Sequence, residues 1–149
     1  IDAHHGNGTE SIFYNDRRVF FLSLHQDPDT LYPGTGYAFE NKEHVLNVPL
    51  PPGTGDARYL AALEKALGAL RNFSPDAIGI SAGFDTFSED EIAGLSVSRS
   101  ETYHEIGRRI AKASDCAKFA VLEGGYYIPK LGENVCNFLM AFAEKQRDG

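Results

Sequence analysis

Two residues near the start of the chain have the types and spacing of metal ligands. Asp2 and His4 are separated by one residue, and alternate side chains of an extended strand point to the same face. A carboxylate and an imidazole on one face can bind a divalent metal ion together. Gly6 and Gly8 follow, and glycine lets the backbone leave a strand in conformations that other residues rarely adopt. The stretch therefore predicts part of a metal site at a strand end.

Further candidates follow two later strands. Residues 76–82 form a short, mainly apolar run, and Asp85 comes after it and a Gly-Phe pair. Residues 118–122 form a second apolar run, which leads through a Gly-Gly pair to Tyr126. In open α/β sheets, ligands bind beyond the carboxyl ends of the strands. We therefore expect Asp85 and Tyr126 to lie close to the first two candidates.

The elements that must position these side chains alternate between apolar strands and amphipathic helices. We expect strands at residues 19–24, 45–50, 76–82 and 118–122. Helices are expected at residues 10–15, at residues 56–73, after a capping box of Ser98 and Glu101, and around residues 135–142. Helices between short apolar strands predict an α/β fold, with a parallel sheet covered by helices on both faces.

Several stretches, taken in chain order, resemble successive motifs of the zinc-dependent histone deacetylase superfamily. They are residues 2–9, 23–25, 32–36, 47–50, 81–85 and 122–126. This superfamily also includes acetylpolyamine amidohydrolases and acetoin-utilisation proteins. The resemblance implies an arginase/deacetylase-like fold, present here as a partial domain. Residues 1–149 would form the later half of the catalytic domain.

The resemblance implies that Asp2, His4 and Asp85 bind a metal ion, expected to be Zn²⁺. Whether the native metal is zinc or iron stays open. Three protein ligands and one open position are typical of catalytic zinc. Tyr126 matches the tyrosine whose hydroxyl stabilises the oxyanion formed during amide hydrolysis, and loss of one such donor usually costs about 10²- to 10³-fold in rate. In this family the general base is a pair of adjacent histidines that precedes the Asp-x-His motif, and the sequence contains no match to that pair.

The other histidines lack the signature of a replacement base. His5 should face away from the ligands, and His25 lies at a strand exit, so we expect both to be structural. His44 and His104 are expected at the surface. We therefore expect this segment to bind zinc and to be inactive without a base from elsewhere.

The resemblance also implies structural cation sites and a substrate tunnel. One K⁺ site would use the backbone of Asp2, His4 and Leu24 with the Ser23 hydroxyl, and a second would use the carbonyls of Phe13, Asp16 and Val19. The expected tunnel residues are Tyr32, Gly83, Phe84 and Ile92. The sequence departs from the family pattern at residues 37–44 and 89–91, where Glu-Asp-Glu replaces a usual Gly-Asp-Pro turn. The tunnel rim and the substrate therefore stay open.

The expected function is that of a zinc-dependent deacetylase, an amidohydrolase acting on acetyl-lysine, acetylated polyamines or small-molecule amides. One alternative is a non-catalytic, truncated module for assembly or ligand binding. Another is an arginase-like dinuclear manganese hydrolase, but Gly6 and Thr86 stand where further carboxylates would be needed. The expected partner is a second copy in a homo-oligomer or a separate N-terminal half.

Composition restricts the partners and the location. The 149 residues include 21 acidic and 14 basic side chains, a formal net charge of −7. This balance argues against direct binding to nucleic acid or anionic membranes and suits cationic amines. No apolar run approaches the roughly 18 residues of a membrane span, and no signal-like start is present. Cys116 and Cys136 lack C-x-x-C spacing, so we expect buried thiols in a cytoplasmic protein.

Overall fold

Strands and helices alternate along residues 1–144, the part of the chain that the computed structural model describes. In order, the elements are α1 (Asn7–Phe13), β1 (Phe21–Gln26), the 3₁₀ helix η1 (Ala38–Glu40), β2 (Val45–Leu50), α2 (Asp56–Phe73), β3 (Ala77–Ala82), α3 (Ser100–Ala113), β4 (Ala117–Leu122) and α4 (Ile128–Glu144). The α/β class predicted from the sequence is confirmed. The first strand begins two residues later than predicted, because its ladder with β2 starts at Phe21 opposite Val45.

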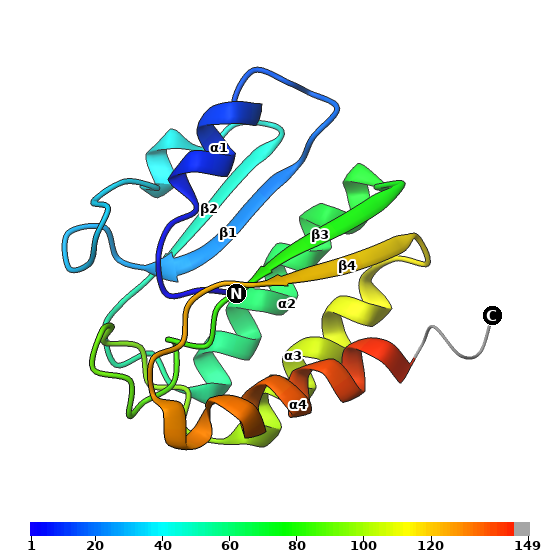
Figure 1. The fold of residues 1–149 in the computed structure, drawn as a ribbon. Helices are drawn as coiled ribbons and strands as arrows, with labels where there is room; N and C mark the ends of the chain where they lie inside the picture. The colour runs from blue at the N-terminus through cyan, green and yellow to red at the C-terminus, as the bar shows by residue number, and fades with distance from the viewer. Residues whose placement is uncertain (145–149) are drawn as a thin grey trace.

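The strands of the described chain form two parallel pairs. β1 pairs with β2, and β3 pairs with β4. Parallel neighbours need a crossover connection, and α3 supplies the one between β3 and β4. Figure 1 shows α1 beside the β1–β2 pair, α2 behind β3, and α3 and α4 below the β3–β4 pair. This arrangement directs the carboxyl ends of β1, β3 and β4 toward the first residues of the chain.

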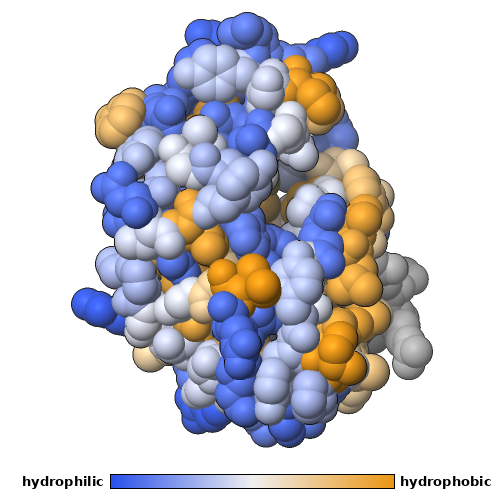
Figure 2. All heavy atoms as spheres, turned by 60° about the vertical axis from the view of Figure 1, so that its left-hand side comes forward, coloured by the Kyte–Doolittle hydropathy of each residue, from blue (hydrophilic) through white to orange (hydrophobic). Residues whose placement is uncertain are grey.

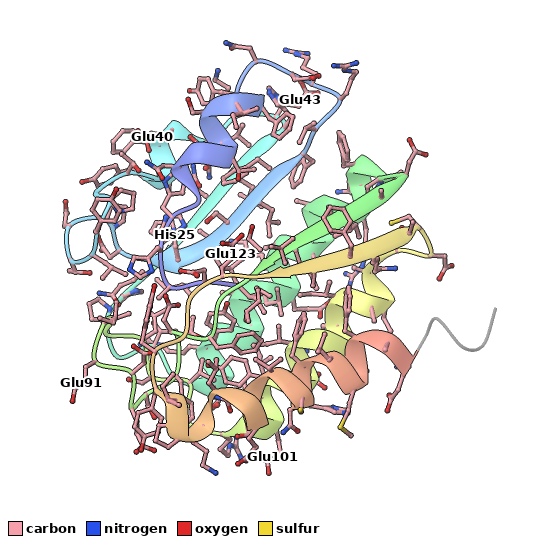
Figure 3. The ribbon with its side chains drawn as sticks, viewed as in Figure 1. His25, Glu40, Glu43, Glu91, Glu101 and Glu123 are labelled. Atoms are coloured by element: carbon pink, nitrogen blue, oxygen red, sulfur yellow. The ribbon has the colours of Figure 1, made fainter. Side chains whose placement is uncertain are left out.

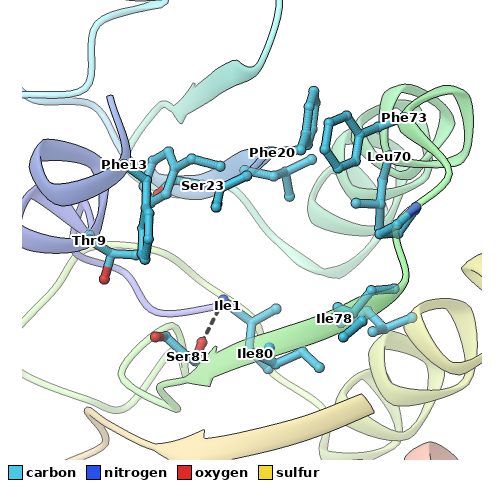
Figure 4. A pocket seen from close by; sticks show the side chains of 18 of the residues that line it. Ile1, Thr9, Phe13, Phe20, Ser23, Leu70, Phe73, Ile78, Ile80 and Ser81 are labelled. Atoms are coloured by element: carbon cyan, nitrogen blue, oxygen red, sulfur yellow. Dashed lines mark hydrogen bonds between the residues drawn. The ribbon is translucent and has the colours of Figure 1, made fainter. Parts of the chain in front are cut away.

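Residues 1–3 bridge the two strand pairs. The Ile1 amino group donates a hydrogen bond to the Ser81 carbonyl at 3.1 Å, and the Gln26 N–H donates to the Ala3 carbonyl at 2.8 Å. The space between β1 and β3 is otherwise a cavity of about 840 Å³, lined mainly by apolar side chains of β1, β3, α1 and α2 (Figure 4). The bridge therefore places Asp2 between the ends of β1 and β3.

The hydrophobic core follows the helical periodicity that the sequence predicts. Its buried members on the helices include Tyr59, Leu63, Leu67, Tyr103, Ile106, Phe138 and Phe142. Helices α3 and α4 approach closely at Gly107, where an added Cβ would lie 2.4 Å from the Phe138 carbonyl oxygen. A side chain larger than hydrogen at this position would push the two helices apart.

The predicted capping box at the start of α3 is wrong. Arg99 occupies the N-cap position, and it makes no side-chain cap hydrogen bond. The carboxylate of Asp56, at the start of α2, instead accepts hydrogen bonds from the Ser98 N–H at 3.2 Å and the Thr102 hydroxyl at 2.5 Å. Asp56 thus holds the start of α3 from 42 or more positions away, a contact that a local pattern could not reveal.

Apolar side chains are exposed along β4 and α4. They include Phe119, Val121, Leu122, Leu139 and Met140. Figure 2 shows apolar side chains gathered along one side of the molecule. Cys136 is also exposed and Cys116 only partly buried, so the expectation of two buried thiols is wrong. Within residues 1–144, no helix combines the length and hydropathy that crossing a membrane requires.

Candidate metal centre

Asp2, His4 and Asp85 converge at the bridge between the strand pairs. The His4 Nδ1 atom lies 2.9 Å from Asp2 Oδ1 and 3.0 Å from Asp85 Oδ2. One ligand atom from each residue lies within 4.8 Å of the other two, and these residues are the one such group among residues 1–144. The segment is not the predicted strand, because residues 3 and 4 form a bend in which the His4 N–H donates to Asp2 Oδ1. Both side chains nevertheless meet a carboxylate that follows β3.

Two glycines leave room for the carboxylates. An added Cβ at Gly83 would lie 1.9 Å from Asp2 Oδ2, and one at Gly124 would lie 2.4 Å from Asp85 Oδ2. Contacts this short do not occur between real atoms, so any larger residue would displace a carboxylate. The glycines at the ends of β3 and β4 are therefore part of the site geometry.

Backbone groups orient both carboxylates. The Ala3 N–H donates to Asp85 Oδ1 at 2.7 Å, and Asp85 has no exposed surface. Asp2 Oδ1 accepts a bond from the His4 N–H at 2.8 Å, and Asp2 Oδ2 accepts one from the Gly124 N–H at 3.1 Å. Such outer contacts hold ligands in the orientation that a metal requires.

The charges in this cluster favour a cation. Burial raises the pKa of Asp2, but hydrogen bonds from His4 and Gly124 outweigh burial and hold that pKa at about 2. Hydrogen bonds with Asp2 and with Asp85 raise the pKa of His4 to about 10. Burial raises the pKa of Asp85, despite its bonds with His4 and Ala3. Two carboxylates that together stabilise a positive charge have the electrostatics of a cation site.

The donor set and its spacing fit a divalent transition metal. Tetrahedral zinc, with bonds of about 2.0–2.2 Å, holds its ligand atoms about 3.3 Å apart. The separations of 2.9 and 3.0 Å from His4 Nδ1 need only a small expansion to reach that value. The side chains of His4 and Asp2 are 24% and 18% exposed, so a further coordination position can face solvent. Ca²⁺, which takes about six to eight oxygen ligands, fits this set poorly.

Tyr126 lies on the loop that leaves β4 beside the cluster. Its side chain is 57% exposed. The same loop contacts the cluster through the bond from the Gly124 N–H to Asp2. Tyr127 differs, because its hydroxyl donates to Glu89 at 2.8 Å. Of the two adjacent tyrosines, Tyr126 is the one whose hydroxyl makes no hydrogen bond within residues 1–144.

His5 and His25 are structural, as predicted. The Nδ1 and Nε2 atoms of His5 lie 2.8 Å from the Thr35 hydroxyl and 3.0 Å from Glu10. His25, at the end of β1 (Figure 3), has no exposed surface, and its ring nitrogens each lie 2.9 Å from the Ser23 hydroxyl or a backbone carbonyl. Neither imidazole has a free nitrogen that could accept a proton from water.

The prediction that His44 lies at the surface is wrong. The residue is 7% exposed, and its Nε2 atom lies 3.1 Å from the Tyr14 carbonyl. The turn before β2 packs against the end of α1, and that contact joins residues 30 positions apart. His104 is partly exposed.

The residues expected to line a tunnel differ in how exposed they are. Tyr32 and Ile92 are 78% and 50% exposed, as the rim of an open site requires. Gly83 abuts the Asp2 carboxylate. The tunnel assignment of Phe84 is corrected, because Phe84 is 2% exposed and its ring packs against Tyr103 at a centroid distance of 5.3 Å. Side chains alternate along the strand exit, and Phe84 points into the core.

The residues expected at the K⁺ sites lie in two places. Ser23 and Leu24 are buried in β1, and the Ser23 hydroxyl lies 2.9 Å from His25 Nδ1. The Phe13 carbonyl accepts a bond from the Asp16 N–H at 2.9 Å, and the Asp16 carbonyl accepts one from the Val19 N–H at 3.0 Å. The second set thus lies in one turn between α1 and β1.

Sequence reasoning missed the role of Asp90, one of three consecutive acidic residues. Asp90 is 4% exposed and accepts hydrogen bonds from the N–H groups of Tyr126 and Tyr127. Its neighbours Glu89 and Glu91 are exposed. The available signal was the match of Asp90 to the aspartate of the Gly-Asp-Pro turn, which neither neighbour shares.

The chain is similar in sequence to known proteins. The family described as "Histone deacetylase domain" matches residues 1–142. A probable deacetylase of Archaeoglobus fulgidus is 45% identical over 137 residues, which cover 85% of this chain and 37% of that protein. An acetylpolyamine amidohydrolase of Mycoplana ramosa is 40% identical over 149 residues, which cover 96% of this chain and 43% of the relative.

The fold of this chain is similar to that of a solved structure. The crystal structure of an acetylpolyamine aminohydrolase from Burkholderia pseudomallei superposes with a TM-score of 0.88 at 33% identity. The match covers 96% of this chain and 43% of that one. The chain thus spans about two fifths of the length of the relatives that it matches.

Proposed function

Because this chain belongs to the histone deacetylase family, we propose that it forms the zinc-binding part of an amidohydrolase site that removes acetyl groups from acetylated amines. The observation that carries the proposal is the convergence of Asp2, His4 and Asp85 within 4.8 Å. The chain covers 37–43% of the length of these relatives. We therefore propose the complete activity for a whole catalytic domain, of which this chain forms one part.

The residues of this chain would hold the metal and stabilise the reaction. Asp2, His4 and Asp85 supply two carboxylate oxygens and one imidazole nitrogen. When bound, zinc polarises the amide carbonyl and lowers the pKa of a water molecule from about 15.7 toward about 7. The Tyr126 hydroxyl, which is free to contact a ligand, would donate a hydrogen bond to the oxyanion as charge develops.

A general base must come from outside this cluster. His5 and His25 both have their ring nitrogens within hydrogen-bond distance of other groups. We infer that the base is the histidine pair of the family pattern, located beyond residues 1–149. This chain would then bind metal and leave water deprotonation to another segment.

The proposed substrate is an acetylated lysine, polyamine or small-molecule amide. The net charge of −7 suits the amine end of such a molecule, and two relatives named above are described as acting on acetylpolyamines. From the resemblance we also propose K⁺ as a structural ion, a cytoplasmic location and assembly with a second copy or an N-terminal half.

The arginase-like alternative has less support. A dinuclear site needs further carboxylates, yet the described residues contain one group of three possible ligands. Thr86, where one such carboxylate would stand, is buried with its hydroxyl 2.9 Å from the Tyr103 hydroxyl. The geometry supports a single metal.

Elemental analysis tests the metal site directly. We expect about one zinc per chain in the wild type, loss of zinc in Asp85→Ala, and retention in the control Asp76→Ala, which removes an exposed carboxylate next to β3. Wild-type protein without zinc after refolding in its presence would overturn the proposal. Equal zinc in all three proteins would show that Asp85 is not a ligand.

Hydrolysis assays with an acetyl-lysine reporter and an acetylated diamine complete the test. Zinc without turnover is the result expected for a chain whose base lies elsewhere. Turnover that is lost in Asp85→Ala would confirm the reaction and would overturn the placement of the base outside the chain. Turnover that Asp85→Ala retains would overturn the proposed site.

A further inference from the structure

Asp90 joins the loops that leave β3 and β4. Its Oδ2 atom accepts hydrogen bonds from the Tyr126 N–H at 2.6 Å and the Tyr127 N–H at 3.1 Å. Its Oδ1 atom accepts one from the Ile92 N–H at 3.1 Å. The residue is 4% exposed, so these bonds are largely shielded from water. One carboxylate thus fixes three backbone groups at the edge of the candidate site.

We propose that Asp90 is a positioning residue that holds Tyr126 at the metal centre. The inference rests on the role proposed above for the Tyr126 hydroxyl. Asp90 acts on the backbone of Tyr126 and lies outside the group of three metal ligands. Its effect on the reaction would pass through the placement of that one tyrosine.

The loop that carries Tyr126 is held on both sides of one flexible residue. On one side, the Gly124 N–H donates to Asp2 at 3.1 Å, and the Gly124 carbonyl accepts the Phe84 N–H at 2.8 Å. On the other side, Asp90 accepts the Tyr126 N–H. Gly125 lies between them with φ +127°, a conformation that other residues rarely adopt. The first tether belongs to the metal cluster, and Asp90 supplies the second.

The same turn determines which tyrosine is available. Glu89 accepts a hydrogen bond from the Tyr127 hydroxyl at 2.8 Å, and the Tyr127 ring lies 5.7 Å from the Phe87 ring. These contacts hold Tyr127 against the β3 exit. The Tyr126 side chain remains 57% exposed. Glu89 thus holds the Tyr127 side chain in place, while Asp90 holds the backbone of Tyr126 and leaves its side chain exposed.

A carboxylate is the group that this position requires. Three N–H donors converge on Asp90, and a carboxylate offers only acceptors, whereas an asparagine amide would direct its own N–H₂ group at one of the donors. A buried N–H that loses a charged acceptor is destabilised. An asparagine carbonyl oxygen could still accept both tyrosine N–H groups, which share Oδ2, and lose only the Ile92 bond, whereas Asp90→Ala removes the acceptor of all three.

Amide exchange tests the tether in the metal-free chain. We expect exchange at Tyr126 and Tyr127 to become about 10- to 100-fold faster in Asp90→Ala, with amides of α2 and α3 within twofold of wild type. The control is Glu91→Ala, a truncation of an exposed side chain that points outward (Figure 3). Unchanged exchange at both tyrosines, or equal acceleration throughout the fold, would overturn the proposal.

A second measurement needs no variant and decides the case if Asp90→Ala does not fold. In the wild type, we expect a scalar coupling through the hydrogen bond between the Tyr126 nitrogen and the Asp90 carboxylate carbon. Its presence supports the tether. A Tyr126 amide that exchanges freely and shows no coupling contradicts it.

Cobalt separates this inference from the proposed function. With Co²⁺ bound, we expect weaker paramagnetic relaxation of the Tyr126 ring protons in Asp90→Ala than in wild type, at a Co²⁺ affinity within twofold. Reduced Co²⁺ affinity with unchanged ring relaxation would make Asp90 a support of the ligands and overturn its positioning role. A wild type that binds no Co²⁺ would contradict the proposed function, while the amide measurements would still decide whether Asp90 holds the loop.

Discussion

Gly83→Ala is a direct test of where the Asp2 carboxylate lies. An added Cβ would stand 1.9 Å from Asp2 Oδ2, and ordinary van der Waals contact begins at 3.4 Å. The carboxylate must therefore move by about 1.5 Å, the difference between these two distances. Metal sites tolerate errors of only about 0.2 Å in ligand distance. Such a movement removes Asp2 from the ligand set.

The expected effect has two parts. Because loss of an outer contact alone typically costs about 10- to 100-fold in metal affinity, we expect zinc affinity to fall by more than about 100-fold. Overpacking destabilises a fold by about 1–3 kcal/mol, and the reduced freedom of the unfolded chain offsets about 0.4–1 kcal/mol of that. A net loss of about 1–2 kcal/mol in the free energy of unfolding follows.

Calorimetric titration with Zn²⁺ and urea denaturation of the metal-free protein measure the two parts. The matched control is Gly68→Ala, because Gly68 lies in α2 with nothing within 4 Å of an added Cβ. We expect the control to bind zinc like wild type and to gain about 0.5–1 kcal/mol of stability. A Gly83→Ala protein with wild-type affinity and stability would refute the placement of Asp2, and lost stability at unchanged affinity would refute its role as a ligand.

Three further predictions concern the fold around the site. Burial lowers the pKa of His25 from 6.5 to about 4, so the unfolded chain binds a proton between these pH values that the folded chain does not. The free energy of unfolding should therefore fall as pH drops from 6.5 to 4, by at most about 3 kcal/mol, and urea titrations should show a smaller fall in His25→Gln. Gly107→Ala should lower the free energy of unfolding by about 1–3 kcal/mol, because its Cβ would lie 2.4 Å from the Phe138 carbonyl oxygen. The control Gly132→Ala, with open space around the added Cβ, should not lower it. Equal stability of the two variants would contradict the close packing of α3 on α4. The exposed apolar side chains of β4, including Phe119 at 60% exposure, should make this chain self-associate, and a monodisperse monomer in sedimentation at all concentrations would count against that.

Local patterns in the sequence were sufficient for the elements and for the types of the site residues. The strands were placed within about two residues, since apolar runs between turn-forming residues depend on near neighbours alone. The buried stripe of α2, including Leu63 and Leu67, follows from helical periodicity for the same reason. The types and spacing of Asp2 and His4 identify them as a pair, although the segment that carries them bends instead of forming the predicted strand.

Predictions failed where a contact joins distant parts of the chain. The start of α3 is held by Asp56, more than 40 residues earlier, and not by the predicted capping box. His44 is buried by a contact with Tyr14, across 30 residues. Phe84 faces the core because Tyr103 of α3 packs against it. Each partner is chosen by the packing of whole helices, which no short stretch encodes.

The sequence by itself determined which elements form and which side chains could bind a metal, because hydropathy and backbone geometry act between neighbouring residues. Only the tertiary structure decided that Asp85 meets His4 across 81 positions, and that Asp90 is the buried member of its acidic run. Gly83 and Gly124 look like ordinary turn residues in the sequence, yet the structure requires them because carboxylates occupy the space of their missing side chains. Those choices depend on how the crossover helices bring the ends of separate strands together.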